Sequence, residues 1–315
     1  MAPKSRAYPE PMKVTLLAGG TGGTKLAHGF KLRDSPMELT VIANVGDDTE
    51  MHGLHVSPDI DALLYTLAGL IDTERGWGIR DDTHTAHDMF ERLGEPAWFT
   101  VGDADLATHA HRTRLIREGA SLTDATAAMA AALGLTARIL PATDDQHRTR
   151  IETDAGEIAF QDYFVRLRQE PEVRGVRFEG SAQPTPAVLD AIADADLVVI
   201  GPSNPIVSIG PILALPGIRE ALGEAVGVSP IIAGRALKGP AARMLASLGH
   251  EPTALGVARL YAGLVDRFVL DETDTALASA VEELGMQAVV LPTVMRTDAD
   301  RAALAAALAE LSRPA

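Results

Sequence analysis

Four carboxylates in one short segment are the side chains best suited to chemistry. Asp47, Asp48, Asp59 and Asp61 lie in NVGDDTEMHGLHVSPDID, directly after the apolar run ELTVIA. Ligands bind at the carboxyl ends of strands in open α/β sheets. Hard oxygen ligands at this place suit Mg²⁺ that is shared between one or two carboxylates and a substrate phosphate. The segment therefore predicts a magnesium site, with Asp48, Asp59 and Asp61 as the candidate ligands.

Each of these residues also has a structural interpretation. Asp47 or Asp48 could serve a turn, and Asp59 after Ser57-Pro58 could cap the start of a helix. His52 and His55 are interpreted as hydrogen-bonding or surface histidines, because no third histidine completes a site with them. Taken together, and next to a glycine-rich segment, the carboxylates favour a functional role.

The glycine-rich segment Gly19–Lys25, with the sequence GGTGGTK, is the second candidate element. Glycines let backbone amides approach a ligand, and the helix that follows directs its positive end at a phosphate. The segment matches neither the Walker loop nor the dinucleotide loop, which needs a third glycine where Lys25 stands. A tight turn needs only one or two glycines, so their density favours an anion site.

Two further segments carry polar side chains. Gly201–Gly210 (GPSNPIVSIG) follows a buried run, and its Ser and Asn side chains could hydrogen-bond a base or a phosphate. Its prolines and glycines could equally be scaffolding, but its place at a strand end favours ligand binding. Gly102–Arg117 has a mixed-charge face that is usually solvated helix, although Arg112 and Arg117 could clamp a phosphoryl group.

Short apolar runs, each followed by a polar loop, must position these residues. Such runs predict parallel strands that are covered on both faces. They are Lys13–Ala18, Glu38–Ala43, Asp194–Ile200, Val228–Ala233 and Asp266–Leu270. The middle of the chain instead has helical spacing, in Ala62–Leu70, Thr85–Leu93, Leu106–Arg117 and Ser121–Leu133.

The predicted fold class is α/β, with a Rossmann-like parallel sheet core and a largely helical inserted subdomain. We assign residues 12–61 and 150–315 to the nucleotide-binding core and residues 62–149 to the insertion. Residues 1–11 are polar and rich in proline, and are interpreted as a flexible leader.

Composition excludes several classes of function. The chain has 315 residues, with 28 Lys and Arg against 43 Asp and Glu, and a net charge of −15. Nucleic-acid binding needs clustered positive charge and is disfavoured. The absence of cysteine excludes disulfides, thiolate metal sites and a cysteine nucleophile. No apolar run approaches the roughly 18 residues that span a membrane, so we expect a cytoplasmic protein.

The order of the longer motifs is recognisable. The chain reads, in order, GGTGGTKL, NVGDD, SPDIDALLY, WGIRDDT, THAHRTRLIREGASLTD, FQDYFVRLR, EPEVRGV, GPSNPIVSIGPIL, VSPIIAGRALKGPA and FVLDETD. With these motifs the chain resembles, from about Met12 to about Asp274, the 2-phospho-L-lactate transferase family of coenzyme F-420 biosynthesis. The actinobacterial members of that family are phosphoenolpyruvate transferases.

The resemblance implies a homodimeric enzyme that uses Mg²⁺. It would transfer a phosphorylated three-carbon acid from a guanosine diphosphate conjugate to the hydroxyl of the deazaflavin Fo, forming (dehydro) coenzyme F-420-0 and releasing GMP. Asp61 matches the family's Fo-contacting aspartate, and Thr100 stands where a lysine often makes the second contact. The family's usual G-D-R-D reads GDAD here, with Ala104 in place of arginine.

The resemblance also assigns roles to the segments above. The residues that would hold the nucleotide are Gly19, Gly20, Thr21, Gly22, Gly23, Thr24, Lys25, Ser203, Asn204 and Ser208. Phosphoryl transfer needs positioning and charge neutralisation more than covalent help. Asp61 or Asp48 is therefore the candidate catalytic carboxylate that orients the hydroxyl or takes its proton.

A non-catalytic interpretation is the main alternative. The gluconeogenesis-factor proteins, which bind nucleotide sugars, share the glycine loop and the following aspartates. The run from SPDID through FQDYF to GPSNP favours the transferases. A nicotinamide dehydrogenase is disfavoured by the glycine pattern and by the absence of a clear acidic ribose partner.

Overall fold

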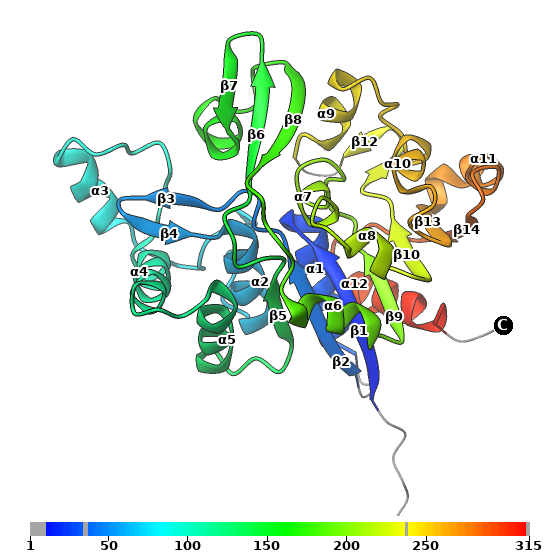
Figure 1. Cartoon of the computed structure of the whole chain (residues 1–315), viewed down its shortest axis with the longest axis horizontal. Helices are drawn as coiled ribbons and strands as arrows, with labels where there is room; N and C mark the ends of the chain where they lie inside the picture. Colours follow the sequence, from blue (N-terminus) through cyan, green and yellow to red (C-terminus); the bar gives the residue numbers. More distant parts are fainter. Residues whose placement is uncertain (1–10, 34–36, 237–238, 313–315) are drawn as a thin grey trace, which may run out of the picture.

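The central feature is a seven-stranded sheet (Figure 1). The computed structural model describes residues 11–33, 37–236 and 239–312. The strand order is β14-β13-β10-β9-β1-β2-β5, and every neighbouring pair is parallel. The strands are β1 (Met12–Ala18), β2 (Met37–Ala43), β5 (Arg138–Pro141), β9 (Leu197–Ile200), β10 (Ala225–Val228), β13 (Arg267–Asp271) and β14 (Gln287–Leu291). The predicted α/β class with a parallel sheet core is confirmed.

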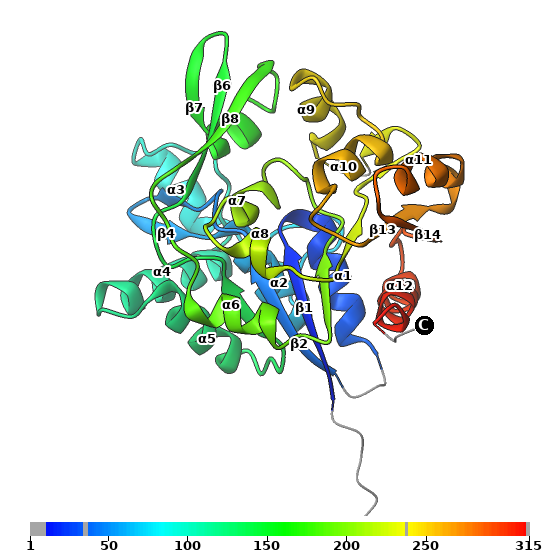
Figure 2. The ribbon, with the colours of Figure 1, turned by 45° about the vertical axis from the view of Figure 1, so that its right-hand side comes forward.

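Both faces of the sheet are buried, which explains why its strands are continuous apolar runs. In β1, Leu16 belongs to one core cluster and Leu17 to the other. The Leu16 face is covered by α1 (Gly20–Lys31), α2 (Pro58–Ala68) and α12 (Asp298–Glu310). The Leu17 face is covered by α6 (Pro186–Ala193) and α10 (Ala254–Tyr261). Figure 2 shows α12 beside α1.

The remaining elements are shorter or lie outside the sheet. The helices are α3 (Thr85–Arg92), α4 (Asp103–Arg117), α5 (Leu122–Ala132), η1 (Asp162–Arg166), α7 (Gly210–Leu213), α8 (Ile218–Ala221), α9 (Ala241–Ser247), η2 (Glu272–Leu277) and α11 (Ala278–Glu282). The strands are β3 (Thr49–Met51), β4 (Leu54–Val56), β6 (Arg148–Thr153), β7 (Gly156–Ala159), β8 (Val173–Glu179), β11 (Ile231–Ile232) and β12 (Arg235–Ala236). No helix of the described residues is long and apolar enough to cross a membrane.

The structure divides the chain differently from the predicted boundaries. Strand β5, inside the predicted insertion 62–149, pairs with β2 as the edge of the central sheet. Strands β6, β7 and β8 form a separate antiparallel sheet, although residues 150–315 were assigned to the core. This three-stranded sheet stands at the top of Figure 1, and α3, α4 and α5 lie to its lower left. Of the predicted leader 1–11, residues 1–10 lie outside the described residues.

Two predicted segments differ locally. The strand predicted over Val228–Ala233 is divided, because β10 ends at Val228 and the short β11 follows. The predicted glycine loop is the beginning of α1, whose N-cap is Gly19. Gly20, Gly22 and Gly23 therefore lie within the first turn of a helix, and Gly19 is the residue that precedes it.

Candidate active site

Three segments begin side by side at the carboxyl edge of the central sheet. In the sheet register, Ala18 lies beside Ala43, and Leu17 lies beside Ile200. The glycine-rich segment, the loop with the carboxylates and the loop 201–210 therefore start next to one another. This is the edge at which open α/β sheets bind ligands.

Asn44 joins Asp47 of the second loop to Asp59 at the start of α2. Its Nδ2 donates to Asp47 Oδ1 at 3.2 Å and to Asp59 Oδ2 at 2.9 Å. Its Oδ1 accepts the Gly46 N–H at 2.8 Å. Burial, followed by the charges of Asp59 and Asp48, raises the pKa of Asp47 well above its usual value. The loop thus concentrates negative charge that its hydrogen bonds only partly offset.

Asp59 links this loop to the glycine-rich segment. Its Oδ1 accepts the Gly20 N–H at 2.6 Å, so the carboxylate lies at the positive N-terminus of α1. Burial raises the pKa of Asp59 to about 6, although hydrogen bonds from Asn44 and Gly20 act in the opposite direction. A Cβ on Gly19 would lie only 2.6 Å from Asp59 Oδ2. The lack of a side chain at Gly19 therefore makes room for the Asp59 carboxylate, which belongs to the protein itself.

Gly22 and Gly23 permit a second close approach, to the loop that follows β9. A Cβ on Gly22 would lie 1.9 Å from the carbonyl oxygen of Pro202, and one on Gly23 would lie 2.6 Å from Ser203 Oγ. The Gly19 N–H also donates to Ser203 Oγ at 3.3 Å. The two segments that were predicted to bind nucleotide are thus in direct contact.

Replacing Gly22 with alanine is expected to lower the free energy of unfolding by about 1–3 kcal/mol, because overpacking against a backbone carbonyl forces the chain to shift. Urea denaturation measures the change. Thr21→Ala, at the half-buried neighbouring position, is the matched control and should stay within about 0.5 kcal/mol of the parent. Equal stability of the two variants would contradict this packing.

The polar residues of α1 contact the chain itself. Thr24 Oγ1 donates to Gly20 O at 2.7 Å, and Lys25 Nζ donates to Met295 O at 3.1 Å. Thr21 is half-buried. Lys25 is therefore directed toward the C-terminal part of the chain.

The loop after β9 is built around Asn204. Its Oδ1 accepts the Ile206 N–H at 2.9 Å, and its carbonyl oxygen accepts the Ser208 N–H at 3.1 Å. Ser203 and Ser208 are both buried. A Cβ on Gly19 would lie 2.8 Å from Ser208 Cβ, so both serines adjoin the start of α1.

One oxygen of Asp48 has no hydrogen-bond partner in the part of the chain that the structure describes. Its Oδ2 accepts from Ser57 Oγ at 2.8 Å and lies 3.0 Å from His55 Nε2. Its Oδ1 is buried and has no hydrogen-bond partner among the described residues. An unpaired buried acceptor costs about 1–3 kcal/mol. This oxygen is therefore suited to a proton donor or a cation that arrives with a substrate.

Asp61, in contrast, is engaged in a buried ion pair. Arg112 of α4 is fully buried; its Nη2 contacts Asp61 Oδ1, and its Nη1 lies 3.2 Å from Asp61 Oδ2. Arg112 Nη1 also donates to His55 O at 3.2 Å. The arginine side chain was expected on a solvated helix face, but the pairing with Asp61 brings it into the interior.

The ion pair continues into a buried cluster between α2 and α4. His109 Nδ1 lies 3.5 Å from Asp61 Oδ2, and His109 Nε2 lies 3.4 Å from Asp105 Oδ1. Asp105 Oδ1 accepts from the Tyr65 hydroxyl at 2.7 Å. Thr100 is half-buried in the segment that leads into α4. The cluster fixes the start of α2, which carries Asp61, to the insertion.

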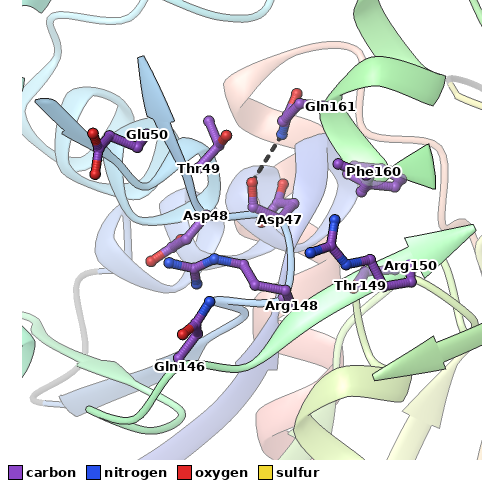
Figure 3. Close-up of a pocket in the computed structure, with 12 residues that line it drawn as sticks. Asp47, Asp48, Thr49, Glu50, Gln146, Arg148, Thr149, Arg150, Phe160 and Gln161 are labelled. Carbon is purple, nitrogen blue, oxygen red and sulfur yellow. Dashed lines mark hydrogen bonds between the residues drawn. The ribbon is translucent and has the colours of Figure 1, made fainter. Parts of the chain in front are cut away.

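A cavity of about 270 Å³ adjoins the carboxylates. Figure 3 shows Asp47 and Asp48 on one side and the arginines of β6 on the other. The lining residues are Gly46, Asp47, Asp48, Thr49, Glu50, Gln146, Arg148, Thr149, Arg150, Ala159, Phe160 and Gln161. The cavity is thus bounded by acidic groups from the central sheet and basic groups from the three-stranded sheet.

Comparison with known proteins gives the family. The model of the family described as 2-phospho-L-lactate transferase CofD matches residues 14–306. The chain belongs to the CofD family. A "phosphoenolpyruvate transferase" of Streptomyces griseus is 42% identical over 93% of this chain and 95% of its own length. A "2-phospho-L-lactate transferase" of Methanosarcina mazei is 43% identical over 89% of this chain and 94% of its own.

A structural relative supports the fold of this CofD-family chain. A Bacillus halodurans protein of the UPF0052 family has a TM-score of 0.65 at 17% identity. The match covers 95% of this chain and 99% of that protein. At this identity the likeness concerns the fold alone. The predicted resemblance to the transferase family is confirmed by the sequence relatives.

The magnesium that the CofD resemblance implies can be tested against these residues. No group of three or more His, Cys, Asp or Glu side chains in the described part of the chain is arranged to hold a metal ion. Both oxygens of Asp59 accept hydrogen bonds, and both of Asp61 face Arg112. Asp47 and Asp48 line the cavity and are less committed. They fit a cation that is shared with a substrate phosphate better than a cation held by protein alone.

Sequence reasoning missed the arginines of this CofD-family site. Arg148 and Arg150 alternate along β6 and so share one face of the strand. The alternation of arginine with Thr149 and Ile151 was a usable signal, but exposed strands commonly show such a pattern. What makes the arginines part of the site is the contact between β6 and the loop after β2.

Proposed function

We propose that this protein transfers a phosphorylated three-carbon acid, phosphoenolpyruvate or 2-phospho-L-lactate, from its guanosine diphosphate conjugate to the primary hydroxyl of the deazaflavin Fo. The observation that carries the proposal is the family match over residues 14–306, together with relatives named as transferases of these two acids. The mixed-charge cavity at the carboxyl edge of the sheet supports it, because a phosphorylated acid needs basic groups and an attacking alcohol needs a base.

The reaction exchanges one phosphorus–oxygen bond for another. The oxygen of the Fo hydroxyl forms a bond to the phosphorus nearer the acid, and the bond from that phosphorus to the GMP oxygen breaks. GMP leaves with the bonding electron pair, and the product is a phosphodiester. In this proposal Asp48 Oδ1 orients the hydroxyl and accepts its proton, since this buried oxygen has no partner in the described chain.

The other residues of the site bind and position. In this proposal the start of α1 and the loop 201–210 hold the nucleotide, because they are in contact and lie at the edge of the sheet. Asp61 acts through the ion pair with Arg112, which holds the start of α2 in place. It thereby fixes the acceptor side without taking the proton.

Mg²⁺ fits beside Asp47 and Asp48, where carboxylates repel one another. Asp47 is buried next to the charges of Asp48 and Asp59. A divalent cation supplies charge neutralisation for transferred phosphoryl oxygens. We add Asp47 to the predicted ligands and remove Asp59 and Asp61, because hydrogen bonds occupy both oxygens of Asp59 and Arg112 already neutralises Asp61.

The function is tested by mass spectrometry of the product formed from Fo and each guanylylated acid. We expect a phosphodiester of Fo and release of GMP with at least one donor, and no product in excess EDTA. Turnover that persists in EDTA would contradict the metal requirement alone. The alternative regulator predicts binding of a UDP-sugar without any product, and that result would overturn the transferase proposal.

A further inference from the structure

The basic wall of the cavity points to a site for an anionic group. Arg148 and Arg150 extend from β6 toward the loop that carries Asp47 and Asp48 (Figure 3). Positions 148 and 150 are two apart on a strand, so their side chains leave the same face. Two guanidinium groups therefore face one small volume from the same side.

The wall is fixed relative to the carboxylates by two hydrogen bonds. The Thr149 N–H, between the two arginines, donates to Gly46 O at 2.6 Å. Gln161 Nε2 donates to Asp47 O at 3.1 Å. A Cβ on Gly46 would lie 2.6 Å from Thr149 Oγ1, so glycine is needed for this approach. The two sheets are thus held together at the cavity rather than merely adjacent.

The two arginines differ in their protein partners. Arg150 Nε donates to Glu179 Oε2 at 2.6 Å, which orients its guanidinium. Arg148 is half-buried, and its charge acts to lower the pKa of Asp47, but its guanidinium makes no hydrogen bond or ion pair with a carboxylate of residues 11–33, 37–236 and 239–312. Arg148 therefore keeps its donors available for a bound anion.

We propose that the cavity binds the carboxylate of the three-carbon acid, with Arg148 as its anchor and Arg150 as a second donor. A guanidinium pairs with a carboxylate through two parallel hydrogen bonds. At about 270 Å³ the cavity is smaller than the roughly 300–1,000 Å³ typical of pockets that enclose a whole drug-sized ligand. It suits one end of the donor rather than a guanosine or a deazaflavin.

This inference rests on the proposed function. The site would fix the orientation of the guanylylated donor. With the carboxylate on Arg148, the attached phosphorus comes toward Asp47 and Asp48, on the opposite wall. That is where the proposed base and the proposed cation site lie. Arg148 would thus be a specificity residue, since a donor without the carboxylate would lose this contact.

The test replaces Arg148 with glutamine and with lysine. A lost charge-assisted pair should raise the KM for the guanylylated donor by about 10- to 100-fold in Arg148→Gln. Arg148→Lys keeps the charge but not the two-pronged geometry of the guanidinium. Its KM for the donor should lie between those of the parent and Arg148→Gln. GDP, which has the phosphates without the carboxylate, should bind all variants within about twofold. Titration with phosphoenolpyruvate alone should show binding to the parent that is lost in Arg148→Gln.

Arg174→Gln is the matched control, because Arg174 lies on β8 of the same small sheet and is paired with Asp154 outside the cavity. It should behave as the parent in every measurement. An unchanged donor KM in Arg148→Gln would overturn the carboxylate site. A loss of GDP affinity as large as the rise in donor KM would also overturn it. A parent protein that forms no product would instead refute the proposed function, and phosphoenolpyruvate titration would still report on the cavity.

Discussion

Replacing Arg112 with leucine is expected to lower the free energy of unfolding by about 3–5 kcal/mol, as when one partner of a buried ion pair is removed. Arg112 is fully buried, and Asp61 is 4% exposed, so the remaining carboxylate could not regain water. The carbonyl oxygen of His55 would also lose its donor. Urea denaturation, followed by circular dichroism, measures the change.

Arg114→Leu is the control on the same helix. Arg114 is exposed and pairs with Glu118, and such surface pairs contribute about 0–1 kcal/mol. Combining Arg112→Leu with Asp61→Asn should recover part of the lost stability, because the uncompensated charge is then gone. An Arg112→Leu variant as stable as Arg114→Leu would show that the buried pair contributes little.

Replacing Asp48 with asparagine is expected to lower turnover by about 10²–10⁴-fold, the range for loss of a general base. Asparagine keeps the size of the side chain and one oxygen but removes the charge. GDP affinity should stay unchanged if the nucleotide is held by α1 and the loop 201–210. Steady-state kinetics at several Mg²⁺ concentrations measure the effect.

The magnesium series separates two roles for Asp48. If Asp48 is only a general base, the Asp48→Asn variant needs the same Mg²⁺ concentration as the parent. If Asp48 is a metal ligand, the variant needs a higher Mg²⁺ concentration. Glu50→Gln is the matched control, since Glu50 also lines the cavity but is exposed. Its turnover should stay close to that of the parent. Parental turnover in a folded Asp48→Asn variant would remove Asp48 from the reaction.

The sheet could be predicted from sequence because burial on both faces leaves a local signature. Strand β1 is apolar at neighbouring positions such as Leu16 and Leu17, which enter separate cores. The run Ala137–Pro141 is strand-like in sequence, but the predicted boundary at residue 149 placed it in the insertion. Its place in the sheet comes from pairing with β2, which is a long-range contact.

The position of the site at the carboxyl edge of the sheet could be predicted from the sequence, but the contacts of its residues could not. The glycine-rich segment does need close approach, yet at Gly22 the approaching group is Pro202 of the same chain. The motif SPDID suggests that Asp61 is accessible to a ligand. Its contact with Arg112 arises only in the folded chain. Arg148 gains its importance from the hydrogen bond between Thr149 and Gly46. These properties depend on tertiary contacts, which cannot be inferred from a single sequence.

The contact between the start of α1 and the loop after β9 also has a consequence for synthesis on the ribosome. The Gly19 N–H donates to Ser203 Oγ across 184 positions of the chain. The N-terminal strand and glycines emerge first, but this side of the site cannot close until the loop 201–210 has left the exit tunnel. A nascent chain that is cut short before residue 201 therefore lacks the surface against which Gly22 packs, and its first helix must wait for a partner that is made much later.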